Sequence, residues 1–161
     1  MTMEGRARLK ASKAFLLLSC LLCLSCEGVI FHDFCPVGSE GWNRNDTLEF
    51  VFEKSIAEDT QAMLSLETRT KAIYPYKDIV VALEAVDTAG AVFRKDTLSC
   101  AVYDDTGRRT GSTAGVIYQQ SCEPVEVSLP YYKSVLRITH LMPDTVLCGV
   151  TDVGIRIVAA D

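Results

Sequence analysis

The sequence has few of the side chains from which catalytic and metal sites are built. Its 161 residues include two histidines and one tryptophan, and no GxSxG, HExxH or phosphate-loop motif occurs. No CxxC pair follows Cys26, which removes the usual zinc and thioredoxin signatures. We therefore expect a protein that is not an enzyme and that holds no metal and no dissociable cofactor.

The residues that could still form a reactive site are far apart in the sequence. A Cys–His pair or a metal site would need the fold to unite His32, Cys35 and His140, and their spacing gives no reason to expect it. We interpret both histidines as ordinary surface or packed residues. Asp104 and Asp105 could bind calcium, but without the EF-hand series of ligands we interpret them as turn residues.

Basic residues are scarce after residue 25. The whole chain has 16 basic and 21 acidic residues. Four of the basic residues and one acidic residue lie within the first 25 positions, so 12 and 20 remain, a net charge of −8. Such a domain does not suit nucleic acid, which requires clustered Lys and Arg. It also lacks a basic patch for anionic lipid headgroups, so attachment to a membrane would need a covalent lipid.

The N-terminal segment has the anatomy of an export signal. Four basic residues precede the apolar run from Ala14 to Cys26, which is shorter than the roughly 20 residues that span a bilayer. Ser25 and Cys26 resemble a lipobox, whose cysteine receives a diacylglycerol and an N-acyl chain. Cys20 has the better local match, but cleavage there would leave too short an apolar core. An ordinary secretory signal, or an uncleaved anchor, is the alternative.

These features divide the chain into three parts. We expect a cleaved signal peptide (1–25), a lipidated N-terminus with a tether (26–45) and one further domain (46–161). The tether prediction rests on glycine and proline near two short apolar patches, with an early strand near residues 29–34. The expected location is the cell envelope, on the outer rather than the inner membrane, facing the periplasm or the cell surface.

Four cysteines remain once the signal and Cys26 are set aside: Cys35, Cys100, Cys122 and Cys148. In an exported domain they could form up to two disulfides, with three possible connectivities. They could equally be buried as small apolar residues. Spacing does not decide between these alternatives.

Short runs of alternating apolar and polar residues dominate the rest of the chain. Leu48, Phe50 and Phe52 alternate with Glu49 and Glu53, a period that predicts a strand with one buried face. Similar runs occupy 62–69, 98–102, 116–118, 125–129 and 153–157, and 79–83 is apolar at both parities, as in a central strand. With turns every 8–12 residues or so, the pattern predicts an all-β fold, a single antiparallel β-sandwich domain. Residues 131–142 fit either a further strand or one short helix near the C-terminus.

Aromatic residues are the main candidates for a binding surface. Trp42 and the tyrosines Tyr74, Tyr76, Tyr131 and Tyr132 could stack on sugars or fill a partner's pocket. The alternative is that they cap the ends of the sandwich core, as most aromatics in small β domains do. Gly154, within the last predicted strand, is expected where a side chain would crowd a neighbour.

Several motifs together resemble a known family. Trp42 precedes the strand at 48–52, and Tyr74-Pro75-Tyr76 leads into the apolar strand. Gly107, Gly111 and Gly115 space a loop, and the chain closes on residues 147–157, LCGVTDVGIRI. In this order, covering nearly all of the chain after the signal, they resemble the gliding motility lipoprotein GldH family of Bacteroidetes. The chain departs from the family at the glycine loop, where Arg109 and Thr113 stand in a region that usually carries a tryptophan.

The resemblance implies a non-enzymatic accessory or structural lipoprotein. Its expected partners are other envelope proteins of the gliding motility or related secretion machinery, besides the membrane that holds the lipid on Cys26. The candidate contact surface comprises Trp42, Tyr74, Tyr76 and Arg109. A lipid-anchored glycan-binding module, using Trp42 or the tyrosines, is the alternative function.

Overall fold

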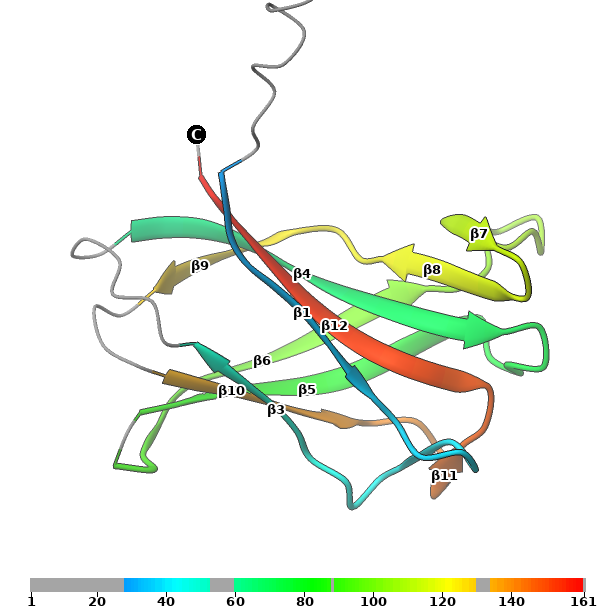
Figure 1. Cartoon of the computed structure of the whole chain (residues 1–161), viewed down its shortest axis with the longest axis horizontal. Helices are drawn as coiled ribbons and strands as arrows, with labels where there is room; N and C mark the ends of the chain where they lie inside the picture. The colour runs from blue at the N-terminus through cyan, green and yellow to red at the C-terminus, as the bar shows by residue number, and fades with distance from the viewer. Residues whose placement is uncertain (1–27, 53–59, 88, 130–133, 161) are drawn as a thin grey trace, which may run out of the picture.

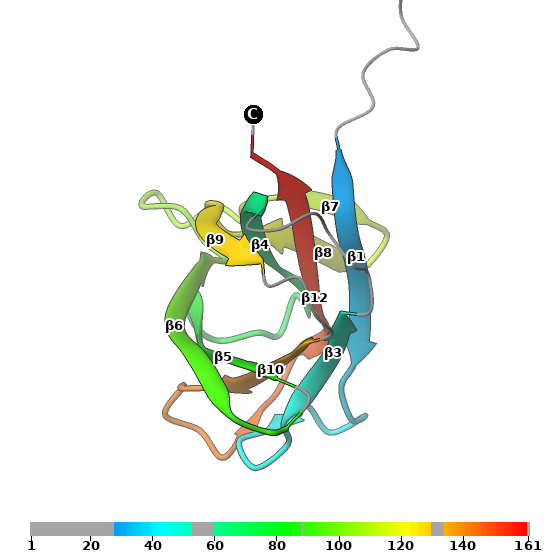
Figure 2. The same cartoon turned by 90° about the vertical axis from the view of Figure 1, so that its left-hand side faces the viewer.

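The computed structural model describes residues 28–52, 60–87, 89–129 and 134–160, and these form two facing β-sheets. Figure 2 shows the sheets as the two layers of a sandwich. The first, called the β4 sheet, has the order β1 (Val29–Pro36), β12 (Val150–Ala159), β4 (Thr60–Lys71), β8 (Ile117–Ser121), β7 (Ser112–Ala114), with β9 (Val125–Leu129) also paired to β4. The second, called the β5 sheet, has the order β3 (Leu48–Phe52), β10 (Ser134–His140), β5 (Asp78–Val86), β6 (Val92–Ala101).

Every pairing between described strands is antiparallel. A two-stranded ribbon of β2 (Trp42–Asn43) and β11 (Val146–Leu147) closes one end of the sandwich. The predicted all-β antiparallel sandwich is therefore confirmed, and the strands lie where the alternating runs placed them.

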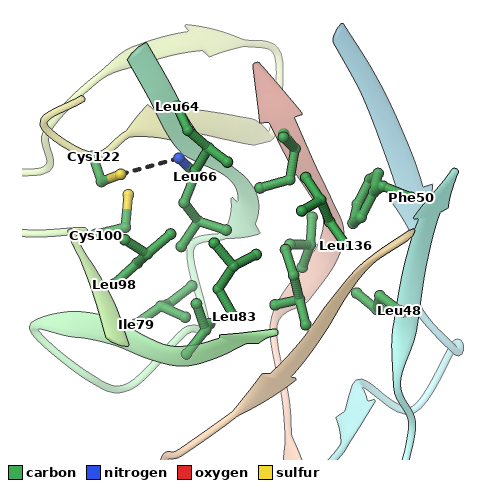
Figure 3. Close-up of a cluster of buried hydrophobic side chains, with 14 of the residues drawn as sticks. Leu48, Phe50, Leu64, Leu66, Ile79, Leu83, Leu98, Cys100, Cys122 and Leu136 are labelled. Atoms are coloured by element: carbon green, nitrogen blue, oxygen red, sulfur yellow. Dashed lines mark hydrogen bonds between the residues drawn. The ribbon is translucent and has the colours of Figure 1, made fainter. Parts of the chain in front are cut away.

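The core forms between the two inner faces because the alternation runs through both sheets. In β3, Leu48, Phe50 and Phe52 are buried while the residues between them are exposed. Leu64 and Leu66 of β4 and the apolar residues of β12 meet them from the other side. Figure 3 shows this cluster between the layers. Phe31 of β1 joins it by edge-on contacts with the rings of Phe50, at 6.5 Å, and Phe52, at 5.8 Å between ring centroids.

The part of the segment 131–142 that the structure describes is a strand, not the short helix that the sequence also allowed. In β10 the side chains of Ser134, Leu136, Ile138 and His140 are buried, and those between them are half-buried. This period of two suits a strand with one face on the core. β10 is also the central neighbour of β3 and β5, so pairing on both sides fixes it as a strand.

The described part of the predicted tether, residues 28–45, contributes strands to the sandwich. β1 pairs with β12 from Val29, opposite Val158, to Pro36, opposite Asp152. Gly41 then donates its N–H to the Gly38 carbonyl at 2.9 Å in a turn that leads into β2. Gly41 has a φ of 124°, and a Cβ there would lie 2.6 Å from the Leu147 carbonyl oxygen. Gly38 and Gly41 thus form a tight turn between two strands. Such a turn has the same glycine-rich composition as a linker, which is why the sequence suggested a tether.

Candidate protein-interaction site

Trp42, the first of the predicted contact residues, lies in the core. Its side chain is fully buried, and its indole N–H donates to the Asp46 carbonyl at 3.0 Å. The edge of the ring meets the His140 imidazole, with 5.2 Å between centroids. The ring is therefore used in packing the end of the sandwich, the position that the alternative interpretation of the aromatics expected.

Tyr74 also packs inward, while Tyr76 reaches the surface. Tyr74 is 2% exposed, and its hydroxyl donates to the Asp78 carbonyl at 2.7 Å. This burial raises the pKa of Tyr74 well above its usual value. Tyr76 is half-buried with its ring 6.0 Å from that of Tyr74. A hydrogen bond with Asp144 is the main cause that raises the pKa of Tyr76.

Arg109 ties the loop after β6 to the end of β4. Its guanidinium donates to the Thr70 hydroxyl at 3.0 Å and to the Lys71 carbonyl at 2.8 Å. The same group lies over the rings of Tyr118, at 4.3 Å from the centroid, and Tyr103, at 4.8 Å. A guanidinium that both stacks and donates in a plane is a role that lysine does not fill. Arg109 is therefore a half-buried clamp whose position depends on two tyrosines that the sequence did not single out.

These contacts join five side chains into one group, which we call the tyrosine end: Tyr74, Tyr76, Tyr103, Arg109 and Tyr118. The Tyr103 hydroxyl donates to the Tyr74 carbonyl at 3.4 Å, which connects the Arg109 clamp to the Tyr74–Tyr76 pair. Tyrosine and arginine are the residue types that dominate the energy of protein interfaces. Tyr76, Tyr103, Arg109 and Tyr118 are half-buried and present these residue types at the surface, whereas Tyr74 supports them from the core.

Two exposed aliphatic residues lie beside the tyrosine end. Ile73 is 70% exposed and follows Lys71, the last residue of β4. Val116 is 76% exposed and precedes Ile117, which pairs with Lys71. They are the two most exposed large apolar residues that the structure describes. Val116 was expected to begin a strand, but β8 begins one residue later, at Ile117, and no sequence pattern singled out Ile73.

The structure does not bring together His32, Cys35 and His140, the residues that a Cys–His pair or a metal site would need. His32 points to the outer side of the β4 sheet, where its Nε2 lies 3.1 Å from a Glu67 carboxylate oxygen. His140 is buried beside Trp42 on the other sheet. Cys35 is half-buried on β1, against the Pro36 carbonyl. Within the described residues no group of three His, Cys, Asp or Glu side chains is placed to hold a metal ion.

Glu67 organises the polar outer side of the β4 sheet. It is 6% exposed, and besides His32 it accepts a hydrogen bond from the Gln119 amide at 3.1 Å. Gln119 in turn accepts from Arg69 at 3.1 Å, and the Arg69 guanidinium lies 3.8 Å from the centroid of the Phe34 ring. The burial of Glu67 was not predicted, because it occupies a polar position of the alternating run, where a solvent-facing side chain is expected.

The Asp104 carboxylate stabilises the turn in which it lies. One carboxylate oxygen accepts the N–H of Thr106 and of Arg108, both at 2.9 Å, and the Thr106 hydroxyl at 2.7 Å. These bonds, with that of the Thr106 hydroxyl the largest cause, hold the pKa of Asp104 below its usual value. Asp105 instead pairs with Lys77 at 2.6 Å. The two carboxylates therefore have different partners, as turn residues do, and do not converge on a common ion site.

The lipidation site and the signal peptide (1–25) lie outside the described residues, as do Tyr131 and Tyr132. In the described part of the chain no helix is long and apolar enough to cross a bilayer. The four cysteines from Cys35 onward are free thiols in this structure.

Comparison with known proteins places the chain in a family. A family model described as GldH lipoprotein matches residues 29–157, whereas a comparison with curated proteins gives no match. Among solved structures, a protein from Sulfurospirillum deleyianum is 10% identical with a TM-score of 0.43, over 81% of this chain and 98% of that one. The Eiger TNF from S. frugiperda is 8% identical with a TM-score of 0.38, over 83% and 94%. Such low structural likeness carries no argument about function, but the family match runs from the first residue of β1 into β12. The chain therefore belongs to the GldH lipoprotein family.

Proposed function

We propose that this lipoprotein is a non-enzymatic accessory or structural component of gliding motility or related secretion machinery, acting through contacts with other envelope proteins. The observation that carries this proposal is the family match over residues 29–157, which covers nearly all of the described sandwich. The GldH lipoprotein family is not a known enzyme family. His32, His140 and Cys35 lie apart from one another, so the proposal assigns them no joint chemical role.

The proposed anchor is a diacylglycerol with an N-acyl chain on Cys26. Three acyl chains hold a protein on a membrane where one would hold it only marginally. Only Glu27 and Gly28 separate Cys26 from Val29, the first residue of β1. Even when fully extended, this link spans no more than about 11 Å. The sandwich would therefore sit close to the membrane, with the start of β1 nearest to it.

The tyrosine end lies at the other end of the β4 sheet from the start of β1. Val29 pairs with Val158, which pairs with Met63 near the beginning of β4. Lys71, beside the tyrosine end, is eight residues further along the same strand, about 26 Å at a rise of roughly 3.3 Å per residue. Figure 1 shows β1 starting beside the chain's C-terminal end while the β4 arrow points away from it. An anchored sandwich would thus present its tyrosine end away from the lipid, where a partner can reach it.

The test is recovery of partners from detergent-solubilised membranes of the native host. Tagged wild type is compared with Ile73→Asp/Val116→Asp, which places charge beside the tyrosine end. The matched control is Val51→Asp/Val92→Asp, whose valines are 44% and 41% exposed on the β5 sheet. We expect wild type and control to recover the same envelope proteins and the first variant to lose them. Recovery of no envelope protein by wild type would overturn the proposal.

The glycan-binding alternative loses its best platform, because the Trp42 ring is fully buried. Four tyrosines were candidates for glycan stacking. Tyr131 and Tyr132 lie outside the described residues and Tyr74 is buried, so Tyr76 is the described candidate that reaches the surface. Specific binding of the purified protein on a glycan array, abolished in Tyr76→Ala, would favour this alternative over the protein-contact role.

For location, we propose the outer rather than the inner membrane. Density-gradient separation of the two membranes tests this directly, and protease treatment of intact cells distinguishes the cell surface from the periplasm. Recovery of the protein with inner-membrane markers would contradict the assignment.

A further inference from the structure

Two of the four cysteines face each other across the sandwich. Cys100 lies near the end of β6, the edge of the β5 sheet, and Cys122 directly follows β8 in the β4 sheet. They are 0% and 7% exposed. Figure 3 shows their sulfur atoms directed toward one another at one side of the core.

Both thiols rest against the same short stretch of β4. The Leu66 N–H donates to the Cys122 sulfur at 3.0 Å, and the Cys122 N–H donates to the Leu66 carbonyl at 2.9 Å. The Thr68 hydroxyl donates to the Cys100 sulfur at 3.8 Å. Leu66 and Thr68 are two residues apart on the inner face of this strand. β4 therefore holds both sulfurs, one from each sheet: Cys122 through the Leu66 backbone and Cys100 through the Thr68 hydroxyl.

A groove gives access to this pair from outside. Its walls are residues of β6, from Thr97 to Ala101, and the segment that runs from Ser121 to Val125, with Cys122 among the lining residues. The groove lies where the edge strand β6 approaches the gap between β8 and β9. A reagent that enters it meets Cys122 first, because Cys100 is fully buried.

We propose that Cys100 and Cys122 form a disulfide that links the two sheets in the exported protein. A disulfide-bearing oxidant, either a thiol oxidoreductase or oxidised glutathione, supplies the chemistry. The Cys122 thiolate attacks a sulfur of the oxidant's disulfide, giving a mixed disulfide and one released thiolate. The Cys100 thiolate then attacks the Cys122 sulfur and expels the second thiolate. The two cysteines lose two electrons and two protons in total, and the oxidant's disulfide takes up the electrons as two thiols.

Burial governs when this reaction occurs. It raises the pKa of the Cys122 thiol and raises that of Cys100 to about 12, so few thiolates exist in the closed sandwich. We therefore expect oxidation during folding, or through the groove, rather than spontaneously in air.

The geometry selects one of the six possible pairs among these four cysteines. Cys35 is on β1, an edge strand of the β4 sheet, and β12 and β4 separate it from β8. Cys148 is exposed in the turn between β11 and β12, where its sulfur contacts the Val146 carbonyl. Cys35 and Cys148 therefore stay outside this link and serve as internal controls.

The proposal rests on the export that the proposed function requires, and peptide mapping tests it directly. Cells are lysed in N-ethylmaleimide, and the full chain is purified in detergent and digested with trypsin without reduction. Cleavage after Lys95, Arg108, Arg109 and Lys133 puts Cys100 and Cys122 on separate peptides, and Cys35 and Cys148 on two others. We expect the 96–108 and 110–133 peptides to be linked, with Cys35 and Cys148 alkylated. Alkylation of all four cysteines, or linkage of another pair, would overturn the proposal.

A stability measurement on the wild-type protein gives a second test, in which variants serve only as controls. A reductant should lower the melting temperature of wild type by about 5–10 °C, because the bond closes a loop of some 20 residues. The reductant should not change the melting temperature of Cys100→Ala/Cys122→Ala. It should lower that of Cys148→Ala as much as that of wild type.

Failure of export is distinguished by fractionation. If the protein remains in the cytoplasm, the proposed location fails, and the purified chain treated with oxidised glutathione still tests the pair. Linked 96–108 and 110–133 peptides after that treatment support the pairing, and four free thiols refute it.

Discussion

Substitution of Gly154 by alanine tests the packing on the outer side of the β4 sheet. Gly154 is in the middle of β12, with Phe34 of β1 as its register partner. A Cβ at this position would lie 2.6 Å from one Phe34 ring carbon and below 3.0 Å from two more. The expected crowding at Gly154 is thus confirmed, and the group that is crowded is an aromatic ring rather than backbone.

The loss of stability in Gly154→Ala can be estimated from the contacts that the Phe34 ring would lose. Phe34 would have to leave its place under the Arg69 guanidinium, now 3.8 Å from its centroid, at a cost of roughly 0.5–1 kcal/mol. Partial exposure of the half-buried ring costs about 1 kcal/mol more. Gly154 has no positive φ, so alanine restricts the unfolded chain without straining the strand and returns about 0.4–1 kcal/mol. The net expectation for Gly154→Ala is a loss of about 1 kcal/mol, and Gly154→Val should lose more.

Chemical denaturation of four proteins measures this coupling: wild type, Gly154→Ala, Phe34→Ala and the double variant. Without the ring nothing opposes the new methyl group, so Gly154→Ala should become stabilising in the Phe34→Ala background, by about 0.4–1 kcal/mol. The sign of the substitution therefore reverses. If Gly154→Ala costs the same in both backgrounds, the ring is not the reason for the glycine.

Three further predictions concern the other sites. His140 has no hydrogen-bond partner at either ring nitrogen among the described residues, and burial lowers its pKa. The unfolded chain therefore protonates first, and unfolding free energy should fall as pH drops below about 6.5, by up to roughly 1.4 kcal/mol per pH unit. Denaturation of His140→Phe across pH 5–7 should lack this component. Arg109→Lys should lose about 1–2 kcal/mol of stability, because lysine cannot make both hydrogen bonds and both ring contacts; an unchanged melting curve contradicts the clamp. Cys26→Ser should move the protein from the membrane fraction to the aqueous fraction, and persistence in the membrane would exclude the lipid anchor.

The fold could be predicted because alternation is a local signal. Residues 48–52 and 153–157 carry their apolar faces in their own sequence, and two sheets that each have one apolar face must pack together. The segment 131–142 stayed ambiguous, since a few apolar residues in a short run fit both periods. For the described residues 134–140, pairing with β3 and β5 decides in favour of a strand, and these pairing partners are distant in sequence.

The contact residues were harder to predict, because exposure depends on distant neighbours. Trp42 sits on a strand of two residues, too short for any period, and its burial follows from the β11 ribbon about a hundred residues later. Arg109 was named for a departure from the family pattern, whereas its position comes from Tyr103 and Tyr118. The sequence identified the residue types but not which of them face solvent.

The early strand changes what the lipid does in the proposed arrangement. A tether of twenty residues would let the sandwich move tens of ångströms from the membrane. β1 begins at Val29 and pairs with β12 as far as Asp152. The strand therefore cannot move away from the rest of the sandwich as a flexible tether would. An anchor on Cys26 would instead hold one edge of the β4 sheet beside the lipid. The tyrosine end would then lie at a fixed distance above the membrane and could contact only partners at that distance. Insertion of a ten-residue Gly/Ser linker before Val29 should then leave membrane attachment and stability unchanged while reducing partner recovery. Equal recovery with and without the linker would show that height above the membrane has no part in the interaction.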